Sequence, residues 1–395
     1  MMTTLAVENY RSLRHLVVPL GPLNVVTGAN GSGKSSLYRA LRLLADAARN
    51  GAVAALAREG GLTSTLWAGP EKIGRAVREG LHPVQGTARS EPVNLRLGFA
   101  GGRDDFGYAI DLGLPPLAAQ TMFGSDPDIK RESVWSGPVL RPASLLADRH
   151  KGAVRIRDTD GTWSHQTHSI RPYDSMLSEF ADPRHAPEVL RLRERIRSWR
   201  FYDHFRTDAA APARGSHVGT RTPVLSHDGA DLAAALQTIR EIGDSGALAA
   251  AIDLAFPGSQ LTVADHAGRL DLQLRQPGLL RPLGAAELSD GTLRYLLLVA
   301  ALLTPRPPEL LVLNEPETSL HPDLLAPLAQ LIAMAADHSQ IIVVSHSRPL
   351  ITAVERLAVD HAPEVRTIEL TKDFGQTHIV GQGPLDEPPW HWPKR

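Results

Sequence analysis

The stretch LNVVTGANGSGKSSLYRALRLL, residues 23–44, decides the fold of this chain. An apolar run typical of a buried strand ends at Val26, and three leucines then recur at helical spacing: Leu37, Leu41 and Leu44. Between strand and helix, residues 28–35 fit the pattern G-x-x-x-x-G-K-S/T, which needs a strand before it and a helix after it. The stretch therefore predicts a strand–loop–helix unit of an α/β protein.

This glycine-rich loop has the chemistry of a phosphate cradle. Glycines let backbone N–H groups surround an anion without a Cβ clash, and the following helix directs its N-terminal dipole at the same anion. Lys34 is expected to reach the β- and γ-phosphates of a nucleotide, and the Ser35 hydroxyl to bind Mg²⁺. A structural turn with a chance lysine is the alternative, and the flanking elements disfavour it. The expected nucleotide-binding residues are Asn30, Gly31, Ser32, Gly33, Lys34, Ser35 and Ser36.

Two apolar segments later in the chain end in polar residues. ELLVLNEPETSLHP, residues 309–322, predicts a buried strand that ends at Asn314 and is followed by Glu315. Such acidic strands are typical of nucleotide hydrolases, which usually have Asp at the last strand position. SQIIVVSHSRPL, residues 339–350, predicts another buried strand, followed by His346. A single histidine at a strand end is most often structural, so its place in the order of motifs matters.

ELSDGTLRYLLLVAALL, residues 287–303, predicts a long buried helix. Its start at Ser289, Asp290 and Gly291 has residues that cap helices well. Taken alone, the stretch is typical of a capped core helix.

The order of these segments resembles that of a known superfamily. Together with ENYRSL near the start, the segments GANGSGKSS, LSDGTLR, LNEPETSLHP and VVSHS resemble the ABC-type ATPase core of SMC, RecF and OLD-like proteins. They resemble most closely the bacterial AAA-type ATPases of that superfamily. The resemblance covers both ends of the chain and little of the middle. It implies an α/β P-loop core with a mixed sheet and flanking antiparallel β-hairpins, and ATP and Mg²⁺ as ligands.

The resemblance also implies catalytic and metal-binding roles for matching positions. Glu315 would be the general base for the attacking water, His346 the contact to the γ-phosphate, and Lys34 the cation on the phosphates. The implied metal positions are Ser35 and Asn314.

Ser289 and Gly291 match the signature that binds the γ-phosphate of ATP held by another subunit. This role implies an ATP-dependent homodimer, with two ATP molecules enclosed between head-to-tail subunits. A helix N-terminus with a free hydroxyl suits an anion that the loop of its own chain cannot reach.

The chain departs from the family pattern at three points. Asn314 stands where Asp is usual, and Asp290 replaces a common glycine and adds a negative charge near a phosphate site. No glutamine occurs between Lys34 and Gln85, so the glutamine-loop residue of the family is not assigned.

Composition excludes several classes of function. The 395 residues include no cysteine, which removes disulfides, thiolate zinc sites and cysteine nucleophiles. A formal net charge of −1 gives no global attraction to nucleic acid or to anionic membranes. The start of the chain lacks a signal-peptide pattern, and the longest apolar run, residues 295–303, is too short to span a bilayer. We therefore expect a cytoplasmic protein without membrane insertion.

The middle of the chain indicates scaffold. Alternating hydrophobic residues predict β-hairpins at residues 93–112, 152–166 and 259–275. Residues 207–229, rich in small residues and proline, predict a flexible connection. We find no internal repeat and no heptad run long enough for an SMC-like coiled coil.

Residues 186–206 predict a helix crowded with arginine. One interpretation is a nucleic-acid contact with the interleaved aromatic residues Trp199, Phe201 and Tyr202. The arginines alternate, however, and would spread around a helix axis instead of forming a stripe. The spacing therefore favours a solvated helix that packs through its arginine stems.

We predict three parts for the chain. Residues 1–115 and 259–383 would form a discontinuous ABC-type ATPase core, and residues 116–258 an inserted α/β middle lobe. Residues 384–395 would be an irregular tail rich in proline and tryptophan, docked through Trp390 and Trp392.

The predicted function is a Mg²⁺-dependent ATP-binding and hydrolysing switch that dimerises around ATP and serves DNA maintenance or anti-phage defence. Asn314 could make it a slow enzyme. Two alternatives stay open: a nucleotide-binding sensor with little turnover that acts through a protein partner, and a transporter ATPase subunit, which the missing glutamine loop disfavours. An OLD-type nuclease domain is not expected, because only a short tail follows His346. Nucleic acid and a separate effector protein stay open as partners.

Overall fold

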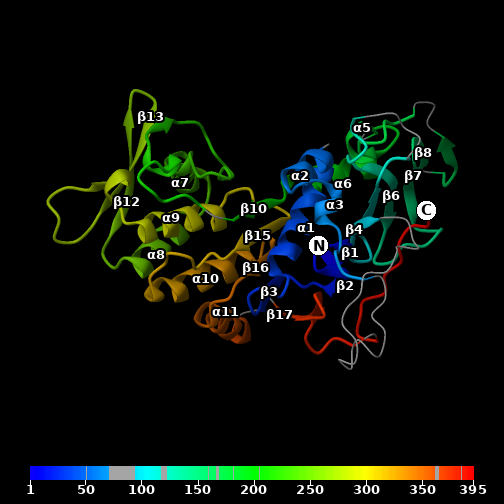
Figure 1. Ribbon diagram of the computed structural model, residues 1–395. Coiled ribbons are helices and arrows are strands. Elements are labelled where there is room, and N and C mark those ends of the chain that lie inside the picture. Colours follow the sequence, from blue (N-terminus) through cyan, green and yellow to red (C-terminus); the bar gives the residue numbers. More distant parts are fainter. Residues whose placement is uncertain are drawn as a thin grey trace. The chain divides into compact units, whose positions relative to one another are not determined.

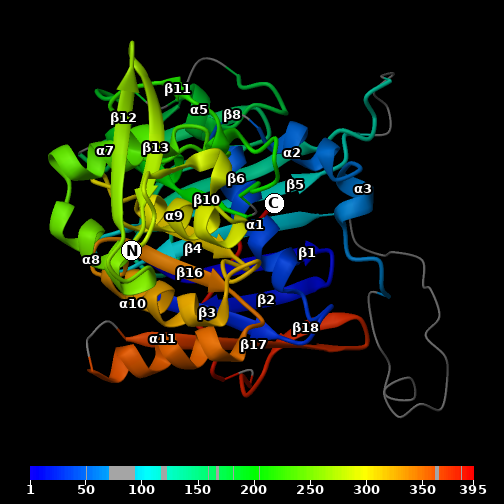
Figure 2. The same ribbon diagram turned by 90° about the vertical axis from the view of Figure 1, so that its left-hand side faces the viewer.

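A computed structural model shows that the chain forms two compact units. Both contain helices and β-sheet strands (Figures 1 and 2). The first unit comprises Met1–Gly21, Thr27–Ser198 and Ile368–Arg395, and the second comprises Pro22–Val26 and Trp199–Thr367. The predicted α/β class is confirmed, and the segment predicted as a middle lobe contributes to both units. The structure describes residues 1–49, 51–70, 94–116, 122–158, 160–165, 169–180, 182–203, 205–360, 364–383 and 385–395. Gln85 lies outside these residues.

The first unit is built on an antiparallel sheet with the strand order β2-β1-β4-β5-β6-β7-β8-β9. The hairpins predicted at residues 93–112 and 152–166 are confirmed as β4–β5 and β8–β9, although residues 93, 159 and 166 lie outside the described part. A further hairpin pairs β17 (Val365–Asp373) with β18 (Gln376–Ile379). The sheet strands are β1 (Met2–Tyr10), β2 (Leu13–Pro19), β4 (Leu95–Gly101), β5 (Phe106–Gly113), β6 (Asp128–Ser136), β7 (Leu145–His150), β8 (Ala153–Arg157) and β9 (Trp163–His165).

Helix α1 (Lys34–Ala47) packs against β1 and β4 of this sheet. The leucines that predicted the helix are buried, because 3.6 residues per turn places them on one face: Leu37, Leu41 and Leu44. The other helices of the unit are α2 (Ala52–Arg58), α3 (Leu62–Thr65), α5 (Met176–Glu179) and α6 (Pro187–Ser198).

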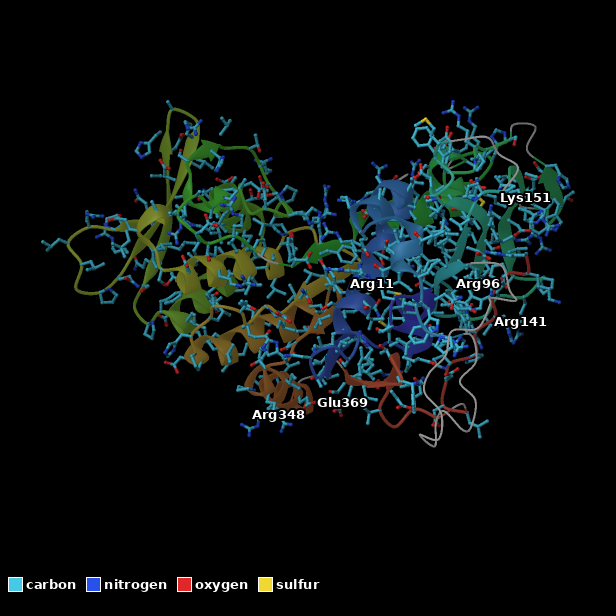
Figure 3. The ribbon with its side chains drawn as sticks, in the orientation of Figure 1. Arg11, Arg96, Arg141, Lys151, Arg348 and Glu369 are labelled. Carbon is cyan, nitrogen blue, oxygen red and sulfur yellow. The ribbon has the colours of Figure 1, made fainter. Side chains whose placement is uncertain are left out.

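Two arginine side chains of the first unit, Arg11 and Arg96, which Figure 3 labels, pair with acidic residues of other segments. Arg96 on β4 lies 3.2 Å from Glu8 on β1 and 3.1 Å from Asp111 on β5. Arg11, after β1, lies 2.6 Å from Glu59 at the end of α2. Cross-strand pairs of opposite charge stabilise a sheet modestly, so these contacts mainly fix which segments are neighbours.

The C-terminal tail belongs to the first unit and packs there through aromatic rings. Among residues 385–395 the structure assigns no helix or strand, and the ring of Trp390 packs 5.7 Å from that of Trp135 on β6. Trp392 packs 5.1 Å from Trp390, and Arg395 lies 2.7 Å from Asp111. Buried aromatic area and the ion pair of Arg395 with Asp111 thus help to hold a segment in which the structure assigns no strand.

The second unit is organised around parallel strands in the order β10-β15-β16-β3. In register, Asn314 of β15 faces Val344 of β16, and Val344 faces Val26 of β3. The strands are continuous apolar runs because helices cover a parallel sheet on both faces. Their bounds are β3 (Leu23–Gly28), β10 (Arg200–Tyr202), β15 (Leu310–Asn314) and β16 (Gln340–Val344), and the helices are α7 (Leu232–Ile242), α8 (Ser245–Ala255), α9 (Asp290–Leu302), α10 (Leu325–Ala335) and α11 (Arg348–Asp360).

The predicted hairpin at residues 259–275 is confirmed as β12 (Gln260–His266) and β13 (Arg269–Arg275). Its two-residue turn places Ala267 and Gly268 at positive φ, as right-twisted hairpins require. Two short strands pair with β13, namely β11 (His217–Val218) and β14 (Leu283–Gly284). No helix among the described residues is long and apolar enough to cross a membrane.

The predicted arginine-rich helix is confirmed as α6 only up to Ser198, and the flexible connection predicted after it is wrong. The arginine-rich helix ends at Ser198, and residues 200–202 enter the parallel sheet as β10. Its aromatic residues Trp199, Phe201 and Tyr202 are buried, so they cannot stack on nucleic-acid bases. The segment predicted as a flexible connection contains the short helix η1 (Pro212–Arg214) and β11, because the largely buried side chain of Arg214 anchors it.

Candidate functional site

The phosphate loop follows β3 in a conformation that only glycine tolerates at two points. Gly28 has a φ of 141°, and a Cβ there would lie 2.2 Å from the carbonyl oxygen of Leu370. Gly33 has a φ of 112°, and a Cβ there would lie 2.2 Å from the Thr377 hydroxyl. Thr377 belongs to β18, and its hydroxyl lies 2.8 Å from the carbonyl oxygen of Ser32. Glycine is therefore required because β17 and β18 pack directly on the loop.

The loop offers donors suited to an anion. Helix α1 begins at Lys34 with no side-chain cap at Gly33, so its first backbone N–H groups have no intrahelical acceptor. The Ser32 hydroxyl is buried and has no hydrogen-bond partner among the described residues. The Lys34 ammonium is buried and donates to the carbonyl oxygens of Gly28, at 2.7 Å, and Ala29, at 3.1 Å. An uncapped helix start, an unpaired hydroxyl and a cation in one loop fit a bound phosphate chain.

The acidic strand places Glu315 in a constrained backbone conformation. Its φ of 47° lies in the left-handed region, which is unusual for glutamate and typical of functional sites. The Glu315 N–H donates to the carbonyl oxygen of Val344 at 2.7 Å, and buried Arg294 of α9 donates to the Glu315 carbonyl at 3.3 Å. The backbone N–H and the backbone carbonyl of Glu315 are thus both hydrogen-bonded. Its side chain is 45% exposed, so the carboxylate can contact water.

A second carboxylate, Glu317, holds the turn that carries His346. Its Oε1 accepts a hydrogen bond from the Ser345 hydroxyl at 2.6 Å and from the N–H groups of His346, at 3.3 Å, and Ser347, at 3.2 Å. Its side chain is 8% exposed, and its Oε2 has no hydrogen-bond partner among the described residues. Glu317 therefore fixes the backbone of this turn and cannot serve as the water-exposed base.

Glu315 and His346, predicted as base and phosphate contact, lie together in the structure. The Nδ1 of His346 is 3.7 Å from a carboxylate oxygen of Glu315 and 3.6 Å from one of Glu317. The same side chains line a hollow of about 510 Å³, together with Thr318, Leu320, Pro322, Leu325 and Ser347. This volume is within the usual range of small-molecule sites.

Burial lowers the pKa of the Arg294 guanidinium, and the carboxylates of Glu317 and Glu315 partly oppose this effect. The two acidic side chains of the turn therefore favour the charged form of Arg294. Arg294 and Glu317 were not singled out in the sequence. Their roles come from the meeting of α9, β15 and β16, for which the chain has no local pattern.

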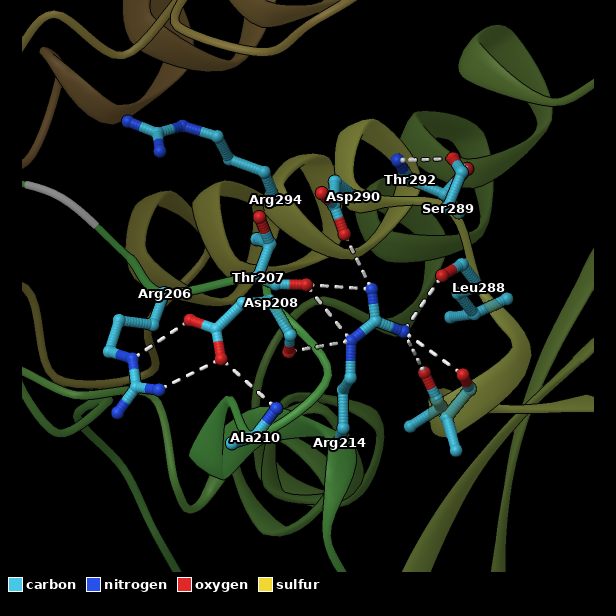
Figure 4. Close-up of polar contacts among 12 residues, drawn as sticks. Arg206, Thr207, Asp208, Ala210, Arg214, Leu288, Ser289, Asp290, Thr292 and Arg294 are labelled. Atoms are coloured by element: carbon cyan, nitrogen blue, oxygen red, sulfur yellow. Dashed lines mark hydrogen bonds and ion pairs between the residues drawn. The ribbon is translucent and has the colours of Figure 1, made fainter.

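The predicted signature residues lie at the start of α9 (Figure 4). Ser289 is the N-cap residue, and its exposed hydroxyl accepts a hydrogen bond from the Thr292 N–H at 3.2 Å. A Cβ on Gly291 would lie 2.9 Å from the carbonyl oxygen of Ser319, in the Ser-Leu-His-Pro turn. The signature and this turn are therefore in contact within the second unit, and glycine is required at their closest approach.

The metal expectation rests on oxygen donors. Among the described residues no group of three or more His, Asp or Glu side chains could hold a metal ion. Ser35 is exposed one residue into α1, and Asn314 ends β15. A hydroxyl and an amide oxygen are ligands or water acceptors that suit Mg²⁺, which keeps several waters and phosphate oxygens in its shell.

A strand that runs into an uncapped glycine loop, and a carboxylate just after the end of a parallel strand of the same sheet, define a P-loop ATPase. The chain belongs to the family described as "AAA domain, putative AbiEii toxin, Type IV TA system", whose model matches residues 23–353. No curated protein matches the sequence.

Solved structures of SMC heads are similar to this chain. The Smc head bound to the C-winged helix domain of ScpA has a TM-score of 0.54 at 14% identity, with 96% of this chain and 97% of that chain covered. The SMC head domain from Thermotoga maritima has a TM-score of 0.47 at 14% identity, with 96% and 98% covered. The first likeness shows the fold. With the family, it confirms the predicted P-loop ATPase of the SMC and ABC-type superfamily.

Proposed function

We propose that the protein is a Mg²⁺-dependent ATP-binding and hydrolysing switch, two copies of which associate around ATP. The observation that supports this most is the pairing of exposed Glu315 with His346 on one hollow, where β15 and β16 end. In such a pair, the carboxylate can take a proton from water and the imidazole can bind a phosphate oxygen. Both tasks are needed for hydrolysis of the γ-phosphate.

Binding of ATP is proposed to rest on the phosphate loop. The Lys34 ammonium now donates to two loop carbonyls, and phosphate oxygens would be the stronger acceptors for it. The uncapped N–H groups at the start of α1 would donate to the same oxygens. Bound Mg²⁺ would neutralise phosphate charge, and Ser35 and Asn314 are the residues proposed to support it.

Hydrolysis is proposed to depend on Glu315 as the acceptor of the proton from the attacking water. Its backbone N–H is bonded to Val344 and its backbone carbonyl to Arg294. The side chain that carries the carboxylate therefore starts from a fixed backbone position. His346 would donate to a γ-phosphate oxygen, and Glu317 keeps its turn in place through three hydrogen bonds. Preorganised donors of this kind stabilise charge without reorganisation in the transition state.

Association of two copies is proposed to use Ser289 and Gly291. The exposed Ser289 hydroxyl and the start of α9 suit a phosphate that another copy brings. Because Gly291 approaches Ser319 closely, an anion at the signature would also act on the turn that follows Glu315. This contact supports a switch in which association and hydrolysis are coupled.

Asn314 reduces the charge available to support Mg²⁺. An aspartate about 5 Å from the ion would contribute roughly 6 kcal/mol at an effective dielectric of about 20, and desolvation would remove most of it. The Asn carbonyl still accepts a hydrogen bond from a water molecule on the metal. The loss should therefore fall on Mg²⁺ affinity and leave the rate at saturation nearly unchanged.

We expect Asn314→Asp to lower the Mg²⁺ concentration for half-maximal turnover about tenfold, which corresponds to ~1.4 kcal/mol. The maximal rate should change by less than about threefold, because Glu315 remains the base. Titration of Mg²⁺ at fixed ATP for both forms measures the two values. Identical Mg²⁺ curves would show that Asn314 does not support the metal.

The biological role is proposed to be DNA maintenance or defence, with a protein partner as effector. The family description names a toxin of a toxin–antitoxin system, which supports the defence role. ATP turnover, measured with and without double-stranded DNA across a salt series, tests the function. We expect turnover that requires Mg²⁺, and a DNA stimulation that fades with salt would support a role on DNA. Tight ATP binding with near-zero turnover in every condition would favour the sensor instead.

A further inference from the structure

Arg214 lies in the segment between β10 and α7, and its side chain is only 10% exposed. On one edge its guanidinium donates to the segment that leads into η1. The Nε donates to the carbonyl oxygens of Thr207, at 2.9 Å, and Asp208, at 3.1 Å, and Nη2 donates to that of Thr207 at 2.8 Å. These bonds fix where the guanidinium lies.

On the other edge, Arg214 holds the residues that enter α9 (Figure 4). Its Nη1 donates to the carbonyl oxygens of Ala285, at 3.0 Å, Ala286, at 3.2 Å, and Leu288, at 2.8 Å. Its Nη2 donates to the Asp290 carboxylate at 2.7 Å. All three nitrogens are thus engaged between two segments more than 70 residues apart in sequence. Only the planar fork of arginine can supply this set, because lysine has three donors at one point.

These contacts surround the signature. Leu288 directly precedes Ser289, and Ala285 and Ala286 lie a few residues earlier, so these bonds hold the backbone that leads to Ser289. Asp290, which stands where glycine is common in the signature that the sequence resembles, has a side chain that is 61% exposed, next to Ser289 in the chain. An uncompensated carboxylate at this place would repel the phosphate that Ser289 and Gly291 are proposed to bind.

We propose that Arg214 is a positioning residue that makes this signature competent for phosphate, by fixing its backbone and cancelling the charge of Asp290. The inference rests on the proposed function. It also explains how the chain tolerates an acidic residue in the signature: Arg214 supplies the charge and the carbonyl contacts that would make an aspartate acceptable there.

The test uses full-length chains that carry Glu315→Gln, so that bound ATP persists. Arg214→Gln and Arg214→Lys are added to this parent, and Arg206→Gln is the matched control. Arg206 is an exposed arginine of the same segment that pairs with Asp208 and does not touch the signature. Light scattering measures ATP-dependent association, calorimetry measures ATP affinity, and amide exchange of residues 285–293 reports the signature backbone.

We expect Arg214→Gln to weaken ATP-dependent association about tenfold to a hundredfold, which is low for the loss of one partner of a hydrogen-bonded charge pair because Asp290 is largely exposed. ATP affinity of the separate chains and association of the Arg206→Gln control should stay within about twofold. Arg214→Lys keeps the charge and loses most carbonyl contacts, so it should fall between parent and Arg214→Gln, with faster exchange at residues 285–293. The Arg214→Lys variant also provides the test if the Arg214→Gln variant does not fold.

The decisive readout is rescue by Asp290→Asn. Added to Arg214→Gln, it should raise the ATP-dependent association constant of that variant at least about threefold, because the repelling charge is gone. A purely structural arginine would show no recovery, and that result would overturn the inference. Unchanged association in both Arg214 variants would also overturn it and would leave the ATP-dependent dimer standing. A parent that does not associate with ATP would instead refute the proposed dimer, and this inference with it.

Discussion

Lys34→Ala is expected to remove nearly all ATP binding, with an affinity at least about a hundredfold lower. In the structure the Lys34 ammonium is buried and donates to two loop carbonyls, and residues 28–36 contain no other cation to replace it. The start of α1 still offers backbone N–H groups, which explains why weak residual binding of phosphate is compatible with the prediction. Titration calorimetry with ATP and Mg²⁺ measures the effect.

Lys372→Ala is the matched control, because Lys372 is an exposed lysine on β17 of the same unit. Its ATP affinity should equal that of the unchanged chain, which would exclude a general charge effect. Thermal unfolding of both variants checks that the loop carbonyls left without the ammonium have not destabilised the first unit. Full ATP affinity in the Lys34→Ala variant would mean that the loop is only a structural turn.

Glu315→Gln is expected to lower ATP turnover about 10²- to 10⁴-fold, the range for removing a general base. The amide keeps the size of the side chain and leaves the backbone contacts to Val344 and Arg294 in place. ATP affinity should therefore be retained, and bound ATP should hold two copies together. Phosphate release and mass by light scattering, with and without ATP, measure the two effects. Glu364→Gln, an exposed glutamate of the same unit, is the control.

Ser289→Arg added to Glu315→Gln should abolish this association, because a bulky cation at the N-cap of α9 blocks the exposed hydroxyl. ATP affinity should not change, since Ser289 lies outside the phosphate loop. The same mass with and without ATP for both variants would show that the enclosed-ATP dimer is wrong. Unchanged turnover in Glu315→Gln would show that another group takes the proton from water.

Prediction from sequence was most successful where a motif is contiguous. The strand, loop and helix of residues 23–44 were correct because each element depends on its own residues. Hairpins were correct because period-two burial and a short turn are both local. β10 was missed because three residues between a helix and a loop carry too little pattern, and only its partner β15 defines it as a strand.

The sequence by itself determined the P-loop motif, the acidic strand, the order of the segments and thereby the superfamily. These are short stretches in which backbone conformation follows from neighbouring residues. The tertiary structure alone decided the residues that hold the site in place. Glu317 fixes the turn of His346 from 29 residues away, and Arg214 binds Asp290 from 76 residues away. Such contacts form only when distant elements pack, because a hydrogen bond or an ion pair depends on distance in space and leaves no spacing in the chain.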